Sequence, residues 1–75
     1  MTFTSDHIRT LASWSGELGL TEASSAMYTL YHHMTVTKTA SIERVNAMAM
    51  STVKTIRDTE TDRAMFYAVM QSWGM

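Results

Sequence analysis

Histidine is the residue type in this chain best suited to bind a metal or to transfer protons near neutral pH. The chain has three histidines, His7, His32 and His33. Neighbouring residues on a helix point about 100° apart, so His32 and His33 do not form the i, i+4 pair that chelates zinc. Their place near the end of a predicted helix favours hydrogen bonds to free carbonyl groups instead. We therefore expect no metal site and no cofactor.

Nucleophilic catalysis is the next chemistry to consider, because serines, histidines and acidic residues are all present. The chain contains no nucleophile elbow, no phosphate-binding loop and no paired-carboxylate motif. A domain of this length also leaves little volume for a pocket of about 300 Å³ beside its core. We expect the protein not to be an enzyme.

Methionine is the least ordinary part of the composition, with eight in 75 residues. It fills irregular gaps in cores and is also frequent on adaptable binding surfaces. Met48 and Met50 lie about 100° to either side of the apolar face of their helix, which makes them candidates for an interface. We assign to the core the four methionines that lie on apolar stripes, namely Met27, Met34, Met65 and Met70.

Charged and aromatic side chains outside the apolar faces are further candidates. Tyrosine is enriched at protein interfaces, and Tyr28 and Tyr67 lie at the edge or on the back of their helices. Arg44, Lys54 and Arg57 lie outside the apolar face of one helix, and acidic residues alternate with basic ones here. Such mixed charge is typical of the rim of a protein interface and disfavours a nucleic-acid site. The predicted partner-binding residues are Met48, Met50, Tyr28, Tyr67, Arg44, Lys54 and Arg57.

Residues 17–30 superficially resemble a helix-turn-helix, in which a glycine-containing turn followed by Leu-Thr introduces a recognition helix. In this chain the turn is Gly19-Leu20-Thr21. The helix that follows it has no lysine or arginine, although phosphate contacts supply most of the affinity of such complexes. An ordinary helical hairpin is the simpler interpretation, and a helix-turn-helix DNA-binding regulator is the alternative function.

Apolar spacing and start signals predict the helices that must position these residues. Ser5, Thr21 and Thr39 are expected to begin the first three helices, and Gly19 is expected to end the first. The β-branched residues 35–39 are expected to connect the second and third helices. These three helices are predicted at about residues 6–18, 22–35 and 40–58.

The last segment carries the largest apolar side chains of the chain. Thr59 followed by Asp62 is a start signal, and the apolar face from Met65 to Trp73 is out of phase with that of the preceding helix. We therefore predict a separate fourth helix at about residues 60–73, with three helices and a bent last one as the alternative. Because no other segment has as much apolar bulk, we expect this helix to be the central element of the core.

Length and composition define the class of protein. Seventy-five residues make a single domain, residues 1–75. A chain of this size buries only about 60% of its unfolded surface. Because it has no cysteine to form disulfides, oligomerisation is the expected source of further burial.

The net charge is −1, which creates no field that would attract nucleic acid or an anionic membrane. No window approaches about 18 apolar residues, and the first residues lack the pattern of a signal peptide. We therefore expect a cytoplasmic protein without a membrane span.

Together these observations predict an all-α protein, a compact bundle of four short helices. The favoured function is a non-enzymatic protein-binding module that acts as a small regulator, adaptor or inhibitor by occupying the surface of another protein. We expect it to form a homodimer. Motif-free helical chains of this size are frequent among phage- and plasmid-encoded inhibitors of host proteins, so such an origin is an expectation on general grounds.

Overall fold

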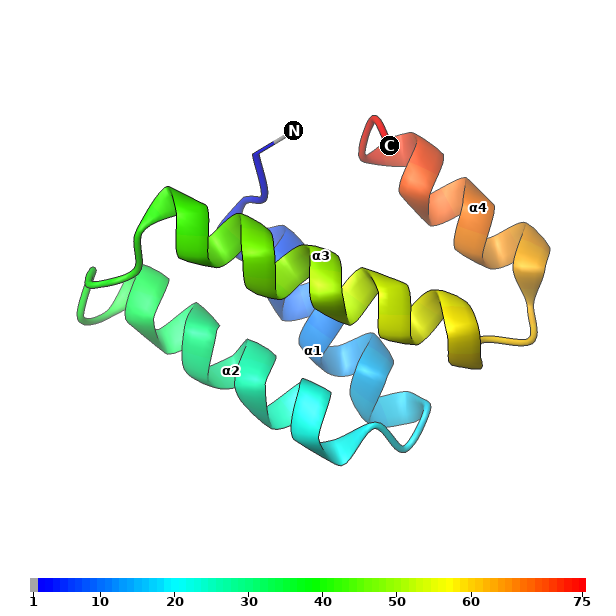
Figure 1. Ribbon diagram of the computed structural model, residues 1–75, viewed down its shortest axis with the longest axis horizontal. Helices are drawn as coiled ribbons and strands as arrows, with labels where there is room; N and C mark the ends of the chain where they lie inside the picture. Colours follow the sequence, from blue (N-terminus) through cyan, green and yellow to red (C-terminus); the bar gives the residue numbers. More distant parts are fainter. Residues whose placement is uncertain (1) are drawn as a thin grey trace.

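The computed structural model describes residues 2–75, and these residues form four α-helices (Figure 1). No strand occurs within this range. The predicted all-α bundle of four short helices is confirmed, and the third and fourth helices are separate. The helices are α1 (Ser5–Glu17), α2 (Thr21–Thr35), α3 (Ile42–Thr59) and α4 (Arg63–Ser72).

The first two helices do not begin at the caps that the sequence predicts. Thr4 caps α1 in place of Ser5: its hydroxyl accepts a hydrogen bond from the His7 N–H at 3.2 Å. In return, the Thr4 N–H donates to Nδ1 of His7 at 3.1 Å. This reciprocal pair satisfies two backbone donors, whereas a cap at Ser5 would satisfy one. α2 begins at Thr21 itself, after Leu20 and without a side-chain cap.

The cap of α3 also differs from the predicted one. The Ser41 hydroxyl accepts from the backbone N–H of Arg44 at 3.1 Å and caps the helix. Thr39 takes no part in the cap, because its hydroxyl is hydrogen-bonded to that of Thr37 at 2.9 Å. Between these threonines Lys38 has a left-handed φ of 54°, which turns the chain before α3 begins. Residues 36–41 form the connection, near the predicted residues 35–39, although Thr35 is the last residue of α2.

α4 begins three residues later than predicted. Asp62 is the cap, and its Oδ1 accepts from the backbone N–H of Met65 at 3.0 Å. Thr59, the predicted cap, is the last residue of α3. Its hydroxyl donates to the carbonyl group of Thr55 one turn earlier, at 2.8 Å, so it is engaged within α3.

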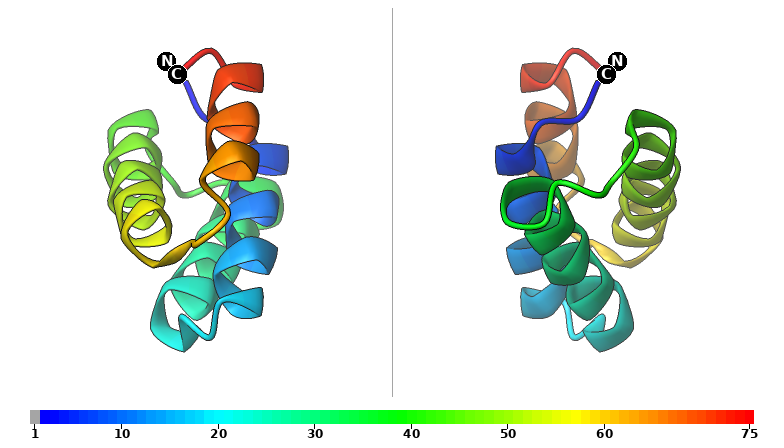
Figure 2. Two further views of the ribbon diagram at one scale, coloured as in Figure 1. Left: turned by 90° about the vertical axis from the view of Figure 1, so that its right-hand side faces the viewer. Right: turned by 90° about the vertical axis from the view of Figure 1, so that its left-hand side faces the viewer.

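α1 and α2 form an antiparallel hairpin, and α3 packs across both helices (Figures 1 and 2). α4 lies on the side of the bundle away from α2, and its large side chains pack against α1 (Figures 1 and 2). Gly19 ends the first helix with a φ of 77°, which confirms the predicted terminator.

The hairpin is close-packed at Gly16. A Cβ at this position would lie 3.1 Å from the hydroxyl oxygen of Ser24. The same Ser24 hydroxyl donates to the carbonyl group of Ala12 at 2.8 Å, which links α2 to α1. Glycine at position 16 therefore leaves room for a hydrogen bond between the two helices.

The core is centred on α1. Ile8, Leu11 and Ala12 are completely buried, and α1 packs against α2 and α3 and reaches α4 through Trp14. The buried Ser15 hydroxyl donates to the carbonyl group of Leu11 at 2.7 Å, so it adds no unpaired polar group. The apolar residues of α2 and α3 that complete this core are Met27, Leu30, Val45, Ala49, Val53 and Ile56.

The prediction that the last helix is the central element is wrong. α4 buries Phe66 and Met70, whereas Met65 is 37% exposed. It reaches α1 through large side chains, and the ring centroids of Trp14 and Phe66 lie 5.7 Å apart. Apolar bulk forms the centre of a core only where neighbours cover it on several sides, and α4 lies at the edge of the bundle.

The four methionines assigned to the core differ in burial. Met27 and Met70 are buried, as predicted, and Met34 packs partly buried against the core. Met65 is exposed, so its assignment to the core is wrong.

Candidate functional site

The predicted partner-binding residues differ in exposure. Tyr28 is 51% exposed, Met50 48% and Tyr67 60%, which is high for such large side chains. Met48 is only half-buried. The three basic candidates, Arg44, Lys54 and Arg57, are exposed.

Three of these residues share one side of α3. Met50, Lys54 and Arg57 have the spacing i, i+4 and i+7, which aligns their side chains along a helix. This side is turned away from the groove between α2 and α3, because Met48, two residues from Met50, lines that groove.

Arg63 joins this side of α3 to α4. Its guanidinium group donates to the carbonyl groups of Arg57 and Glu60 at the end of α3. The same group lies over the rings of Phe66 and Tyr67, with centroid distances of 5.1 and 5.2 Å. These contacts bring Tyr67 next to the basic end of α3.

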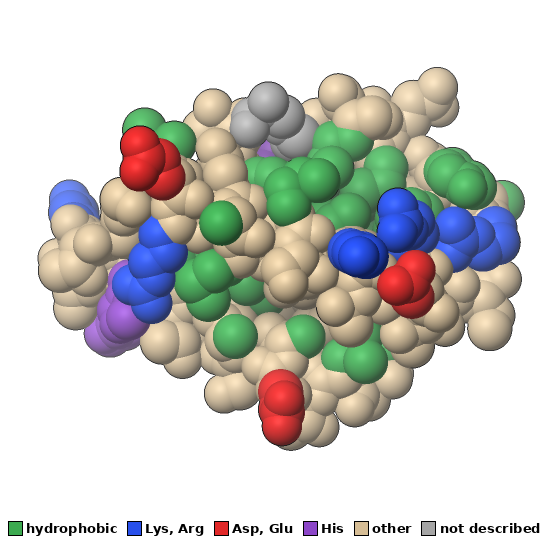
Figure 3. All heavy atoms as spheres, viewed as in Figure 1, with side chains coloured by type: hydrophobic (Ala, Val, Ile, Leu, Met, Phe, Trp, Pro, Cys, Tyr) green, Lys and Arg blue, Asp and Glu red, His purple; other side chains and the backbone are tan. Residues whose placement is uncertain are grey.

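We name this surface the α3/α4 face, and it is composed of Met50, Lys54, Arg57, Arg63 and Tyr67. Figure 3 shows basic side chains gathered over the end of α3 and the start of α4, beside apolar surface. The structure thus unites four of the seven predicted partner-binding residues. Arg63 was not among those seven, although its i, i+4 spacing to Tyr67 is a signal for contact on a helix.

The Tyr67 hydroxyl is electrostatically coupled to Arg63. Nη2 of Arg63 donates to the hydroxyl oxygen at 3.4 Å. This hydrogen bond and the positive charge of Arg63 lower the pKa of Tyr67 from its usual value of 10.0. The contact holds the exposed ring in one orientation against the guanidinium group.

The acidic residues near this face are mostly engaged elsewhere. Oε2 of Glu60 accepts from the indole N–H of Trp14 on α1 at 2.8 Å, and its Oε1 accepts from the Asp62 N–H at 3.0 Å. Asp62 caps α4. Asp58 remains at the face, where its Oδ1 lies 3.5 Å from Nε of Arg57.

The other predicted partner-binding residues lie elsewhere. Met48 lines a groove of about 410 Å³ between α2 and α3, together with Ala23 and Ala26. Tyr28 is exposed on α2. Arg44 lies at the start of α3, where its Nη1 is 3.4 Å from Nδ1 of His33.

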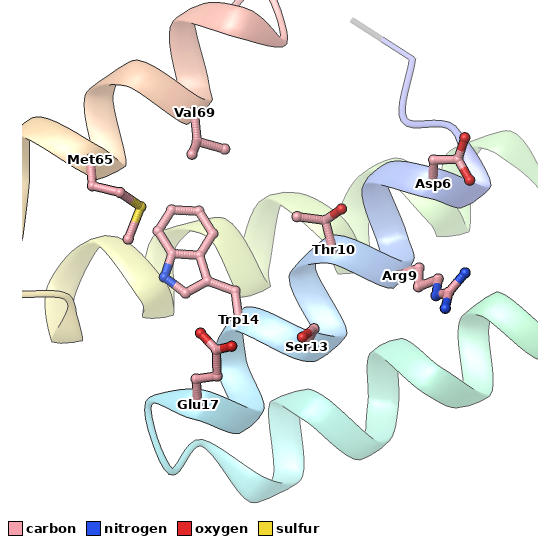
Figure 4. A pocket seen from close by; sticks show the side chains of 8 residues that line it. All are labelled: Asp6, Arg9, Thr10, Ser13, Trp14, Glu17, Met65 and Val69. Atoms are coloured by element: carbon pink, nitrogen blue, oxygen red, sulfur yellow. The ribbon is translucent and has the colours of Figure 1, made fainter.

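A second concave region lies between α1 and α4 (Figure 4). It has a volume of about 560 Å³, so the expectation of little pocket volume is wrong. The buried indole of Trp14 faces Met65 and Val69 across it. Its acidic lining residues Asp6 and Glu17 are eleven residues apart on one helix. The helical rise separates them by about 16 Å, whereas paired catalytic carboxylates lie about 5–10 Å apart.

The hydrogen bond from Trp14 to Glu60 predicts a pH-dependent stability. It lowers the pKa of Glu60 from its usual value of 4.5, and the hydrogen bond from Asp62 acts in the same direction. A carboxylate whose pKa is lower in the folded state stabilises the fold above its unfolded pKa, and this contribution is lost as the pH falls. We expect Glu60→Gln to lower the melting temperature at neutral pH and to have less effect at about pH 3, below the unfolded pKa.

Circular dichroism melting of both proteins across this pH range measures the difference. An equal difference at neutral and acidic pH would show that the charge of Glu60 does not contribute to stability.

The hairpin of α1 and α2 is the part of the chain that the helix-turn-helix interpretation concerns. Ser24, one of the polar residues of the proposed recognition helix, is half-buried and hydrogen-bonded to α1. The exposed residues of α2 include Ser25, Tyr28 and Thr29. DNA binding by this surface stays a prediction, without basic side chains on α2 to contact phosphates.

The histidines have structural contacts. His7 takes part in the cap of α1, and its ring centroid lies 4.5 Å from that of Trp73. Among residues 2–75, no cluster of three or more histidine, aspartate or glutamate residues is arranged to hold a metal ion. In the same part of the chain, none of the helices combines the length and apolar content needed to cross a bilayer.

Comparison with protein-family models, with curated proteins and with solved structures finds no match to this chain.

Proposed function

We propose that this protein is a non-enzymatic protein-binding module that acts as a small regulator, adaptor or inhibitor by occupying the surface of a partner protein. The observation that carries the proposal is the α3/α4 face, where exposed Met50 and Tyr67 lie beside the basic residues Lys54, Arg57 and Arg63. Interfaces are enriched in methionine, tyrosine and arginine.

The chemistry of the face supports binding over catalysis. Met50 offers a flexible apolar side chain, and Tyr67 offers a large ring that Arg63 holds in place. A held aromatic ring loses little conformational entropy on binding, which is typical of residues that contribute most to affinity. Of the basic groups, Arg63 serves structural hydrogen bonds to α3, so its role is to position Tyr67.

A homodimer remains part of the proposal, since the chain is small. The α3/α4 face is a poor surface for it, because a two-fold axis would bring the face against its own copy. Lys54, Arg57 and Arg63 of one chain would then lie near the same residues of the other. We therefore propose that self-association, if it supplies extra burial, uses another surface.

The test is affinity capture from source cells, and it compares the wild-type protein with two double variants as bait. Met50→Asp with Tyr67→Asp alters the α3/α4 face, whereas Met65→Asp with Tyr28→Asp makes the same changes at exposed positions outside it. We expect a captured protein to be retained by the wild type and by the control. Loss of two central contacts should weaken its affinity for the first variant by about 30-fold or more.

A captured protein that binds both variants equally would contradict the role of this face. Circular dichroism confirms that both variants are folded. Sedimentation equilibrium of the same samples measures the oligomeric state, and a monomeric wild type at micromolar concentration would contradict the homodimer.

A further inference from the structure

We propose that the occupant of the α3/α4 face is an acidic segment of a partner protein that also presents apolar side chains to Met50 and Tyr67. This inference rests on the proposed function and names the chemistry of the partner. It follows from how the fold distributes charges that alternate along the sequence.

The fold engages two of the three acidic groups of this segment. In the sequence, residues 54–63 contain three basic and three acidic residues, which balance. In the structure, Glu60 extends to Trp14 on α1 and stays within electrostatic range of Arg63, and Asp62 binds the first turn of α4. The positive charge open to a partner is therefore that of Lys54 and Arg57 on α3, with Asp58 beside Arg57.

Lys54 is the group most available to a partner. Within residues 2–75 it has no acidic side chain within 4.0 Å, and it is exposed. Arg57 lies three residues further on the same side of α3 and forms an exposed ion pair with Asp58. Side chains with this spacing are neighbours on a helix. Two carboxylates of a partner segment can therefore bind both of them.

Charge complementarity selects the acidic protein segment over other occupants. A second copy of this chain would bring like charges together, as argued above. A nucleic acid depends on many phosphate contacts, and here Arg63 is already engaged by carbonyl groups, which leaves only the two basic groups Lys54 and Arg57 on this face. An acidic segment with an apolar side chain matches both the two available charges and the exposed Met50 and Tyr67.

The test is an NMR titration of the isotope-labelled full chain with four probes. The first is an amphipathic helical peptide with leucine on one face and glutamate on the other, and the second replaces every glutamate with lysine. The third is a duplex DNA oligonucleotide, and the fourth is a vesicle of phosphatidylcholine and phosphatidylserine. We expect the glutamate peptide alone to shift the amide signals of Met50, Lys54, Arg57 and Tyr67. The shifts should weaken between about 0.05 and 0.5 M salt, because salt screens exposed charges.

A pair of variants tests the charges directly. Lys54→Glu with Arg57→Glu should lower the affinity for the glutamate peptide by about tenfold or more, since like charges then oppose the peptide. Arg9→Glu with Lys38→Glu makes the same change in net charge at exposed positions elsewhere and should leave the affinity unchanged.

Several results would overturn the inference, and they are distinguishable from failure of the proposed function. Equal binding of both peptides at this face would refute the acidic specificity and leave a protein-binding face in place. Shifts of the same residues by DNA or vesicles, without shifts by the glutamate peptide, would assign the face to another class of partner. Absence of any shift with the glutamate peptide would also refute it.

Discussion

Replacing Leu11 with alanine is expected to lower the free energy of unfolding by about 3 kcal/mol, within the range for buried leucines. Leu11 is completely buried on α1, in the core cluster to which α2, α3 and α4 also contribute. A domain of this size has a total stability of about 3–5 kcal/mol, so the variant should retain no more than about 2 kcal/mol. Urea unfolding followed by circular dichroism measures the loss.

Met65→Ala on α4 is the matched control. Its side chain has as many heavy atoms as that of Leu11, but it is 37% exposed and lies at the edge of the bundle. Substitutions at such positions usually change the stability by no more than about 0.5 kcal/mol. If Met65→Ala destabilised the protein as much as Leu11→Ala, α4 would be the centre of the core, and the arrangement described above would be wrong.

Replacing Trp14 with alanine is expected to cost about 3 kcal/mol as well, and to release α4 in particular. The indole ring packs against Phe66, and its N–H donates to Glu60 at 2.8 Å. The ring contact joins α1 to α4, and the hydrogen bond joins α1 to the segment before α4. Hydrogen exchange of backbone amides measures the effect, and the amides of α4 should lose more protection than those of α3.

Trp14→Phe separates the two contributions of Trp14. It keeps an aromatic ring against Phe66 and removes the hydrogen bond to Glu60, which should cost about 1 kcal/mol. It also serves if Trp14→Ala is too unstable to measure. Equal loss of protection in α3 and α4 for Trp14→Phe would show that this hydrogen bond does not hold α4 in place.

The sequence predicted most of the individual residues of the α3/α4 face, but not which of them lie together. Met50, Lys54, Arg57 and Tyr67 were recognisable because each lies outside an apolar stripe. Met50, Lys54 and Arg57 align by their spacing on one helix. Tyr67 joins them through Arg63, which connects the end of α3 to α4 through backbone carbonyls that have no signature in the sequence. Three other residues also lie outside an apolar stripe, but the path of the chain places them elsewhere: Tyr28, Met48 and Arg44.

The sequence by itself determined where helices form. Apolar periodicity is a property of neighbouring residues, so it predicted four helices within a few residues of α1 to α4. It also identified Gly19 as a terminator, since a left-handed φ is a local requirement. The caps were less predictable, because several adjacent hydroxyl and carboxylate groups can each bind the same free N–H groups.

Only the tertiary structure decided which helix is central and how the charges are distributed. Burial depends on neighbours from distant parts of the chain, so the smaller side chains of α1 are more deeply buried than Met65 of α4. In the same way, Glu60 turns toward α1 because the indole N–H of Trp14 lies 2.8 Å from its carboxylate. A carboxylate that alternates with basic residues in the sequence is thereby bound to a distant helix in space.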